Sequence, residues 1–476
     1  MGVCIRLKVH HFRMKTYVFS YATSDKDNNE FNFGFKVEDA YVAIGSNYYS
    51  NSKTVFFSPR VWYHFCFVVN NTNYSIYIDG VLDHARKITE RSILANASFV
   101  LGQETDVVLG GYQEHQSYSG HITDFNVFSY ALTDEDVQGI ANCSSTLEGD
   151  LVAWSSVNMT VEGNVLELDL SPGEFCTKKT QLTMFPERRT LADATHWCNN
   201  LKAKIALPRS PKQNNDLYNI SKAFFSVCQP PNHARIYLWI GANDVIENTK
   251  FTDVEGNPLA YHNFRGTYNS VRLSCVGMTL PPNDGGWDDA SCSSLYSFCV
   301  ACEEHQPTVL KMRGLCEFDK KAAFCRLYPQ YGELAVFRGF TKYEIHFNAS
   351  LLTWILWDIW TGDTVATYFA YDSSYPLGRH IWTLATDYYV CGLLKGTEHS
   401  LALSACYDWE YSCDDATCIN LTQRCDLRVD CPDASDEISC NKLSLPEDYL
   451  ATITPPGVFH GPLQMDLNVS LLGFSE

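Results

Sequence analysis

The spacing of apolar residues predicts strands in the first part of the chain. From residue 16 to residue 127, aromatic and β-branched residues occur in strand-length runs, and Tyr74, Ile76 and Ile78 alternate along one of them up to the pair Asp79-Gly80. A period of two is typical of a strand with one buried face, and an Asp-Gly pair favours a tight hairpin turn. We therefore predict an antiparallel β-sandwich in this region.

Two short helices are predicted where a capping signature precedes apolar residues at helical spacing. The Thr-x-x-Asp signature at 133–136 stands just ahead of Val137 and Ile140, which share one helical face. A second Thr-x-x-Asp, at 190–193, opens a segment with apolar positions on one face, namely Leu191, Ala194, Cys198 and Leu201. In such a box the threonine hydroxyl accepts a hydrogen bond from a backbone N–H group of the first turn. We expect the first helix to pack on the sandwich.

The rest of the pattern indicates further domains, which the length of 476 residues also requires, because single hydrophobic cores stop growing near about 250–300 residues. Residues 236–302 combine short strands with long loops, and residues 307–404 are again aromatic and strand-like, without a charged cluster that suggests an activity. We predict a multidomain, mainly β protein with these parts: 1–160, the sandwich; 170–304, a second domain of helices and strands; 307–404, an unassigned β-rich domain; 405–441, a small cysteine-rich module; 442–461, a linker; and 462–476, an alternating strand that opens something larger.

Composition places the chain outside the cell. Its 19 cysteines are many for a reducing cytosol, and an odd number leaves one thiol without a partner in the chain. A net charge of −19 argues against nucleic acid as a partner and suits carboxylate clusters that hold calcium. Asn-x-Ser/Thr glycosylation acceptors fit a secreted surface and occur at Asn70, Asn73, Asn96, Asn142, Asn158, Asn219, Asn348, Asn420 and Asn468.

Neither a signal peptide nor a membrane span is evident in the sequence. The first residues lack the apolar core of a secretory signal, so we expect that the N-terminus is missing. The most apolar stretch, 349–360, is shorter than the roughly 20 residues that cross a bilayer, so any membrane attachment would come from sequence beyond 476. We find no nucleophile elbow, zinc-protease helix, phosphate loop or dinucleotide fingerprint, and we expect no catalysis.

The strongest chemical signal lies within residues 406–440, where 35 residues contain Cys406, Cys413, Cys418, Cys425, Cys431 and Cys440. So short a segment cannot build a sufficient hydrophobic core, and disulfides and a metal ion must hold it. Hard carboxylate oxygens of the kind that Ca²⁺ prefers come from Asp426, Asp430, Asp436 and Glu437, and main-chain carbonyls would complete six ligands.

This segment closely resembles a class A repeat of the low-density-lipoprotein receptor. The resemblance implies the disulfides Cys406–Cys418, Cys413–Cys431 and Cys425–Cys440, with carbonyl ligands from Gln423 and Arg428. It departs from the family at Tyr411, where Phe is usual, and at Leu427, where Gly is frequent. Modules of this family bind basic side chains of a ligand through the calcium-ordered acidic face, here Asp426 and Asp430, and the alternative is a rigid spacer.

Several segments of the sandwich stand in the order found in one family: 19–23 (FSYAT), 64–66 (HFC), 101–104 (LGQE) and Gly110-Gly111. Most of residues 1–155 thus resemble a pentraxin-like domain, a laminin-G-like jelly roll. The resemblance implies a bridge across the sandwich between Cys4 and Cys66, opening strands missing before residue 1, and a possible pentamer. It also implies calcium ligands among Asp27, Asn28, Asn29, Glu104, Asp106, Glu114 and Gln116; an extra residue before Glu30 leaves the choice among the first three open, and the alternative is a metal-free sandwich.

The second domain carries Trp197-Cys198, 239–241 (WIG), 275–278 (CVGM) and 286–289 (GWDD), followed by Cys292. On these residues it resembles a C-type lectin α+β domain, which implies a Cys275–Cys292 disulfide and pairing of Cys198 with either Cys302 or Cys299. The Glu-Pro-Asn or Gln-Pro-Asp triplet of the family's sugar site is missing from 263–270, and only Asp288 and Asp289 remain of its calcium cage. We therefore favour a lectin-fold scaffold over a sugar-binding site.

Pro455-Pro456 and the residues from Pro462 to Glu476 resemble the opening of the extracellular domain of a pentameric, Cys-loop ligand-gated ion channel. Two functions stay open. The first is an extracellular or cell-surface protein for calcium-dependent recognition or adhesion, with a protein or glycan ligand. The second is the N-terminal ectodomain of a ligand-gated channel subunit, and sequence beyond Glu476 separates the two.

Overall fold

The computed structural model describes residues 1–13, 15–23, 30–36, 39–45, 47–51, 57, 60–70, 72–88, 93, 97–163, 165–176, 180–229, 236–245, 250–265, 274–279, 285–293, 295–304, 308–315, 323–327, 334–370, 374–387 and 393–440. The linker at 442–461 and the channel-like strand at 462–476 therefore lie outside the described residues. In the described part, none of the helices has the length and apolar character of a membrane-spanning helix.

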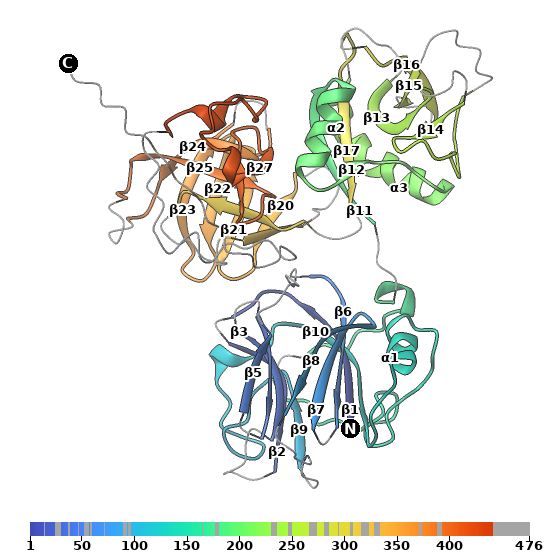
Figure 1. Ribbon diagram of the computed structural model, residues 1–476, viewed down its shortest axis with the longest axis vertical. Coiled ribbons are helices and arrows are strands. Elements are labelled where there is room, and N and C mark those ends of the chain that lie inside the picture. The colour runs from blue at the N-terminus through green and yellow to red at the C-terminus, as the bar shows by residue number, and fades with distance from the viewer. Residues whose placement is uncertain are drawn as a thin grey trace.

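Alternating side chains along the first ten strands build two facing sheets of five strands each (Figure 1). The first sheet contains β10 (Gly120–Phe128), β1 (Gly2–Val9), β6 (Tyr63–Val69), β7 (Asn73–Ile78) and β8 (Val81–Lys87), in that order. The second contains β5 (Asn47–Asn51), β4 (Asp39–Ile44), β3 (Phe31–Lys36), β2 (Thr16–Ala22) and β9 (Ser98–Leu101). The predicted hairpin at Asp79-Gly80 joins β7 to β8, with positive φ at both residues.

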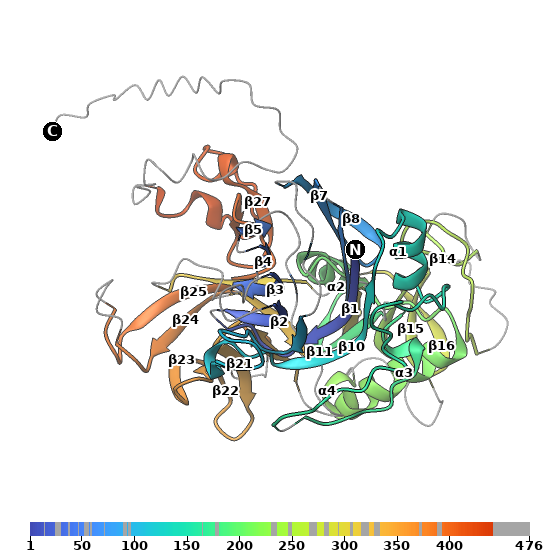
Figure 2. The ribbon, with the colours of Figure 1, turned by 90° about the horizontal axis from the view of Figure 1, so that it is seen from below.

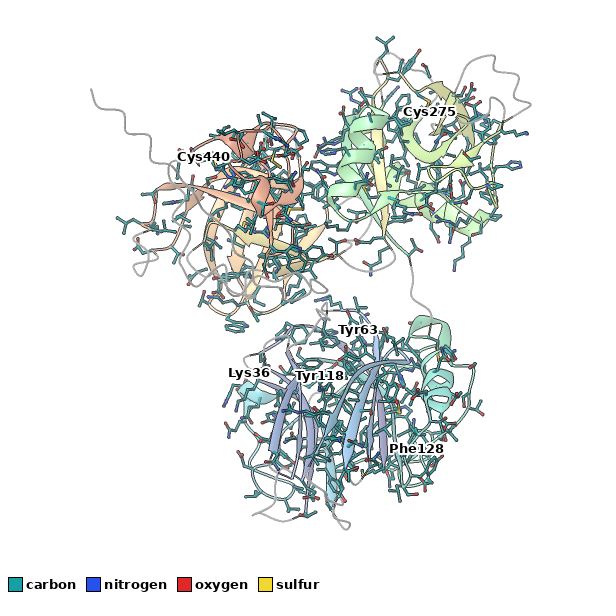
Figure 3. All side chains as sticks on the ribbon, in the orientation of Figure 1. Lys36, Tyr63, Tyr118, Phe128, Cys275 and Cys440 are labelled. Atoms are coloured by element: carbon teal, nitrogen blue, oxygen red, sulfur yellow. A yellow bond between two sulfur atoms is a disulfide. The ribbon has the colours of Figure 1, made fainter. Side chains whose placement is uncertain are left out.

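Aromatic rings from both sheets fill the space between them. Phe19 of β2 lies 5.3 Å from the ring of Phe31 and 5.9 Å from that of Phe67, and all three side chains are fully or almost fully buried. Figure 3 shows side chains packed between the sheets throughout this domain. Complete burial of one such ring contributes about 1.5–3 kcal/mol, so the sandwich has a sizeable core of its own.

The predicted helix after the sandwich forms α1 (Asp134–Ala141). The Thr133 hydroxyl accepts from the Asp136 backbone N–H at 3.1 Å, and the Thr133 N–H donates to the Asp136 carboxylate at 3.1 Å, which is the reciprocal capping box. Val137 and Ile140 are buried with Leu132 and Phe128 of the sandwich. The short turns η1 (Glu114–Gln116) and η2 (Pro172–Glu174) complete this domain.

The second domain wraps helices around an irregular sheet. Its strands are β11 (Gln181–Arg189), β12 (Lys204–Ile205), β13 (Ile236–Asn243), β14 (Thr252–Asp253), β15 (Ser274–Thr279), β16 (Trp287–Ser291) and β17 (Phe298–Glu304). The helical segments are α2 (Leu191–Asn200), capped by Thr190 as predicted, α3 (Pro211–Ser221), η3 (Lys222–Phe224) and α4 (Phe225–Cys228). Cys198 on α2 is buried, as its helical face predicts.

The β-rich region after residue 307 closes into an antiparallel barrel. Its strands follow chain order: β18 (Leu310–Arg313), β19 (Ala323–Leu327), β20 (Val336–Gly339), β21 (Tyr343–Asn348), β22 (Thr353–Asp358), β23 (Asp363–Phe369), β24 (Gly378–Leu384) and β25 (Glu398–Ser404). Pairing of Lys311 with Ser404 joins the first strand to the last. Closure leaves no free sheet edge, and Trp354 and Trp382 are among the rings that fill the interior.

The second domain and the barrel share one hydrophobic cluster. Tyr375 of the barrel stacks edge-on against Phe185 of β11 at 4.9 Å, and its hydroxyl donates to the Met184 carbonyl at 3.3 Å. The sandwich meets the barrel through the Phe12 N–H, which donates to the Phe340 carbonyl at 2.8 Å. The two views in Figures 1 and 2 show the cysteine-rich module lying on the barrel. Altogether the fold is mainly β and multidomain, which confirms the predicted fold class.

Candidate calcium sites

The cysteine-rich module is folded around three disulfides, Cys406–Cys418, Cys413–Cys431 and Cys425–Cys440, the pairs that the class A resemblance implied. Regular structure is limited to β26 (Glu410–Ser412), β27 (Cys418–Asn420) and the single turns η6 (Leu421–Gln423) and η7 (Ser435–Glu437). Its apolar core consists of one disulfide, Ile419 and the ring of Tyr411. The Tyr411 hydroxyl, which the usual Phe lacks, donates to the Ser435 carbonyl at 3.2 Å.

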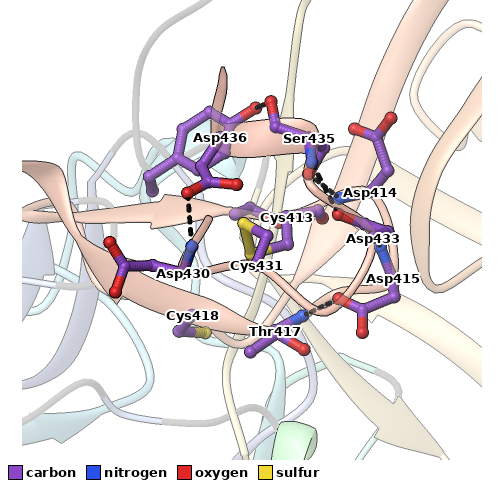
Figure 4. The surroundings of a disulfide bond; sticks show 12 residues. Cys413, Asp414, Asp415, Thr417, Cys418, Asp430, Cys431, Asp433, Ser435 and Asp436 are labelled. Carbon is purple, nitrogen blue, oxygen red and sulfur yellow. Dashed lines mark hydrogen bonds between the residues drawn. A yellow bond between two sulfur atoms is a disulfide. The ribbon is translucent and has the colours of Figure 1, made fainter. Parts of the chain in front are cut away.

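The four acidic residues of the proposed cage lie on one segment, 426–437. Asp436 is fully buried; its Oδ2 accepts from the Asp430 N–H at 2.7 Å, whereas its Oδ1 is buried without a hydrogen-bond partner among the described residues (Figure 4). The Glu437 Oε1 accepts from the Asp426 N–H at 3.0 Å. Burying a carboxylate oxygen without a hydrogen-bond partner costs free energy. A cation bound to the Asp436 Oδ1 would remove this cost, so the atom is suited to be a metal ligand.

The remaining proposed ligands are engaged with the backbone and with each other. The Asp426 Oδ1 accepts from the Arg428 N–H at 2.9 Å, and the Asp430 Oδ1 accepts from the Gln423 Nε2 at 2.9 Å. No three of the four carboxylates bring oxygens within 4.8 Å of one another. The donor set consists of oxygens alone, as calcium requires.

Electrostatics keep the buried carboxylate of Asp436 ionised. Burial disfavours its charged form, but the nearby backbone N–H groups of Asp430, Asp436 and Cys431 and the charge of Arg424 favour it, and together they lower its pKa. The Arg424 guanidinium lies 4.8 Å above the ring of Tyr411 and donates to the carbonyls of Asp436 and Ile438. Arg424 thereby holds the backbone of the acidic segment in place without blocking a carboxylate.

Three other groups of metal-type side chains lie close together in the described part of the chain, and each contains a disulfide: Cys4, His64 and Cys66; Cys406, Glu410 and Cys418; and Cys413, Cys431 and Asp433. Disulfide sulfur is not the thiolate that binds metal ions. We therefore interpret these groups as structural.

In the sandwich, the 102–117 loop gathers three of the predicted oxygen ligands. Glu104 and Gln116 are buried, and Tyr17 and Gln116 hydrogen-bond to the Glu104 carboxylate. The Gln116 Oε1 is buried without a partner among the described residues. Asp106 accepts from the Gln113 Nε2 at 2.7 Å.

Burial raises the pKa of Glu104, and the negative charge of Asp106 raises it further. The hydrogen bonds from Tyr17 and Gln116 and the positive charge of Lys15 lower it, but their sum is smaller. A bound cation would favour the charged form instead. Glu114 is exposed on η1 and its carbonyl, not its carboxylate, accepts from Arg13 at 2.8 Å. Asp27, Asn28 and Asn29 lie outside the described residues, so the other half of this site is not placed.

In the second domain, Asp288 and Asp289 lie on β16. The Asp289 N–H donates to the Asp288 Oδ1 at 3.1 Å, and the Ser274 hydroxyl donates to the Asp289 Oδ2 at 3.4 Å. Residues 266–273 and 280–284, which flank this position, lie outside the described residues. The expectation of a scaffold without a sugar site stays a prediction.

The other disulfides settle one alternative and correct one interpretation. Cys198 pairs with Cys302, and Cys275 with Cys292. Cys4 and Cys66 are bonded, but they face each other on the neighbouring strands β1 and β6, so the bridge lies within one sheet and not across the sandwich. The sequence reasoning missed Cys143–Cys176 and Cys228–Cys299.

A signal for one missed pair was present in the sequence. Cys299 and Cys302 stand three positions apart on β17, so their side chains point to opposite faces and need different partners. With Cys302 bonded to α2, Cys299 reaches Cys228 of α4 on the other face.

The glycosylation acceptors are compatible with attached sugars. Of the nine, seven lie in the described part, and none of these is buried: Asn70, Asn73, Asn142, Asn158, Asn219, Asn348 and Asn420. Asn96 and Asn468 lie outside the described residues. The side chains of Asn70, Asn348 and Asn420 accept from backbone N–H groups two or three residues further on, which is typical of surface turns.

Three family models match separate parts of the chain: the Pentaxin family over residues 1–168, the Lectin C-type domain over 187–304, and the Low-density lipoprotein receptor domain class A over 404–440. None of the three covers residues 305–403, which contain nearly all of the barrel, or any residue after 440.

Among curated proteins, the human neuronal pentraxin receptor is 33% identical over 97 residues, which are 20% of this chain and 19% of that protein. The Xenopus laevis C-type lectin domain family 3 member A homolog is 26% identical over 160 residues, which are 33% of this chain and 79% of that protein. The chain thus spans only about a fifth of the length of the first pentraxin relatives that it matches.

Among solved structures, the native heptameric SAP-like pentraxin from Limulus polyphemus is 27% identical, with a TM-score of 0.32, covering 35% of this chain and 80% of that one. The carbohydrate-recognition domain of the mouse scavenger receptor C-type lectin is 17% identical, with a TM-score of 0.21, covering 26% and 89%. These domain types are typically extracellular binding modules without enzymatic activity, and their families generally bind calcium. The chain therefore contains a pentraxin domain, a C-type lectin domain and a low-density-lipoprotein-receptor class A domain.

Proposed function

We propose that the chain recognises an extracellular ligand in a calcium-dependent manner and that its class A module holds one of the calcium ions. The proposed ligands are the carboxylates of Asp426, Asp430, Asp436 and Glu437, with the carbonyls of Gln423 and Arg428. The observation that carries the proposal is the buried Oδ1 of Asp436, which has no partner among the described residues and belongs to a carboxylate that stays ionised. A bound calcium ion would neutralise the cage and fix its backbone.

The surface around this cage suits a basic ligand. Asp426 and Asp430 are exposed, so each can present a carboxylate oxygen to an ammonium or guanidinium group of a protein or amino sugar. Leu427 is 93% exposed and Val429 is 66% exposed between these two carboxylates. Apolar side chains beside an acidic pair would contact the alkyl stem of a lysine or arginine. These exposed groups support a ligand-binding role for the module over that of a rigid spacer.

Replacing Asp436 with alanine is expected to abolish calcium binding by the module, because the one buried carboxylate of the cage is lost. Isothermal titration of calcium into the whole chain measures this as the loss of one binding event. Asp363→Ala, which removes an exposed carboxylate of the barrel outside the cage, is the control and should bind like the unchanged chain. Equal calcium binding by both variants would exclude the cage.

A second calcium site in the pentraxin domain is supported by the Gln116 Oε1 beside Glu104, which is buried and has no partner in the described part of the chain. Glu104→Gln keeps the size of the side chain and removes its charge, and it is expected to remove a different binding event from the one that Asp436→Ala removes. Titration of the two single variants and the double variant checks this, since separate sites should give additive losses. Retention of every binding event in Glu104→Gln would favour the metal-free sandwich.

A further inference from the structure

One loop of the class A module, residues 414–417, binds both neighbouring domains. On the barrel side, the Arg379 Nε lies 2.6 Å from the Asp414 Oδ1, and the Arg379 N–H donates to the Asp414 carbonyl at 2.9 Å. On the lectin side, the His196 Nε2 of α2 lies 3.1 Å from the Asp415 Oδ2 and 3.0 Å from the Thr417 Oγ1. We call residues 414–417 the docking loop.

The docking loop fits closely against both partners. Asn200, also on α2, donates from Nδ2 to the Asp415 carbonyl and to the Thr417 Oγ1, both at 3.3 Å. At the start of β24, Gly378 has a φ of +87°, and a Cβ there would lie 2.2 Å from the Asp414 carbonyl oxygen. Only a glycine allows this approach, so the contact depends on the exact position of the loop.

The docking loop is also hydrogen-bonded to the segment that carries the proposed calcium ligands (Figure 4). The Asp414 N–H donates to the Ser435 Oγ at 3.0 Å, and the Asp415 N–H donates to the Asp433 Oδ2 at 2.7 Å. Asp433 in turn accepts from the Ser435 N–H at 2.9 Å, and Ser435 directly precedes Asp436. The cage and the docking loop are therefore one hydrogen bond apart.

From these contacts we propose that calcium binding by the class A module controls its docking onto the lectin domain and the barrel; this inference rests on the calcium site proposed above. With the cage neutralised, Asp433 and Ser435 hold the docking loop in the form that binds Arg379, His196 and Asn200. Without the cation, repulsion within the cage loosens this segment, the backbone N–H groups of Asp414 and Asp415 lose their side-chain acceptors, and the module leaves its neighbours. Calcium thus sets the position at which the recognition module is presented.

Zero-length carbodiimide cross-linking of the whole chain reads out docking directly. The Lys202 Nζ of the lectin domain lies 3.9 Å from the Glu410 Oε2 of the module, outside both the cage and the docking loop. We expect calcium to raise the yield of the Lys202–Glu410 cross-linked peptide several-fold over a chelated sample. The contact between Lys204 and Glu255, which lies wholly within the lectin domain, is the internal control and should be unchanged. An equal Lys202–Glu410 yield in both samples overturns the inference.

Reciprocity gives a second test, because a coupling between two equilibria acts equally in both directions. Removing docking contacts with His196→Ala and Asn200→Ala together should weaken the calcium binding event of the class A module at least about fivefold. Asn199→Ala, an exposed position on the same helix, is the matched control. Unchanged affinity in the double variant contradicts the coupling but leaves the calcium site intact. Absence of that binding event already in the unchanged chain contradicts the proposed function instead.

Discussion

Replacing Trp354 with alanine is expected to lower the free energy of unfolding of the barrel by about 3–5 kcal/mol. Trp354 is fully buried on β22, with the ring of Phe347 at 5.2 Å and that of Tyr375 at 5.4 Å. Its Nε1 donates to the Ser374 carbonyl at 2.7 Å. The substitution therefore leaves a cavity inside a closed barrel, whose hydrogen-bonded strands cannot move together to fill it.

The effect should extend into the lectin domain, because Tyr375 also accepts the Ala335 N–H and donates to the Met184 carbonyl. Hydrogen exchange of peptides from β22 and β11 across a urea series measures the two regions separately. Trp360→Ala, at a position that is 49% exposed after β22, is the control and should change stability by less than about 0.5 kcal/mol. Similar losses in both variants would show that the Trp354 side chain does not support the core.

Local features of the fold could be predicted from the sequence because they depend on neighbouring residues. The capping box at Thr133 and the N-cap at Thr190 need only a threonine, an aspartate and a helical apolar face. The hairpin at Asp79-Gly80 needs two residues that tolerate positive φ. The cysteine pairing of the class A module follows from a resemblance confined to 35 residues.

Features that depend on distant contacts could not be predicted. The aromatic, strand-like character of residues 307–404 predicts strands, but closure of the barrel depends on the pairing of Lys311 with Ser404, which no local pattern specifies. The docking of Asp415 on His196 joins residues 219 positions apart. The bonded Cys4 and Cys66 are compatible with a bridge across the sandwich or within a sheet until the strand order is known.

Acidification below pH 6.5 is expected to destabilise the sandwich through His64, which is 1% exposed on β6 opposite Arg6 of β1. Burial first, and then the charge of Arg6, lower the pKa of His64 to about 3 from 6.5. His64 is therefore neutral in the folded protein, and its contribution does not vary with pH above 6.5. As the pH falls below 6.5, His64 becomes protonated in the unfolded chain but stays neutral in the folded chain. The free energy of unfolding therefore falls by about 1.4 kcal/mol per pH unit.

His64→Phe keeps the ring and removes the titration, so the variant should lose about 2 kcal/mol less stability than the unchanged chain between pH 6.5 and pH 4.5. Burial also lowers the pKa of His10 and His11 to about 4. Both remain in the variant, as do the carboxylates, so the difference between the two proteins isolates His64. Hydrogen exchange of the β1 and β6 peptides in urea at each pH measures it, with His115→Phe, at an exposed histidine of η1, as the control. If the free energy of unfolding of the unchanged chain and of His64→Phe depended on pH in the same way, His64 would be protonated in the folded sandwich as readily as in the unfolded chain. That result would mean that solvent reaches His64 and Arg6.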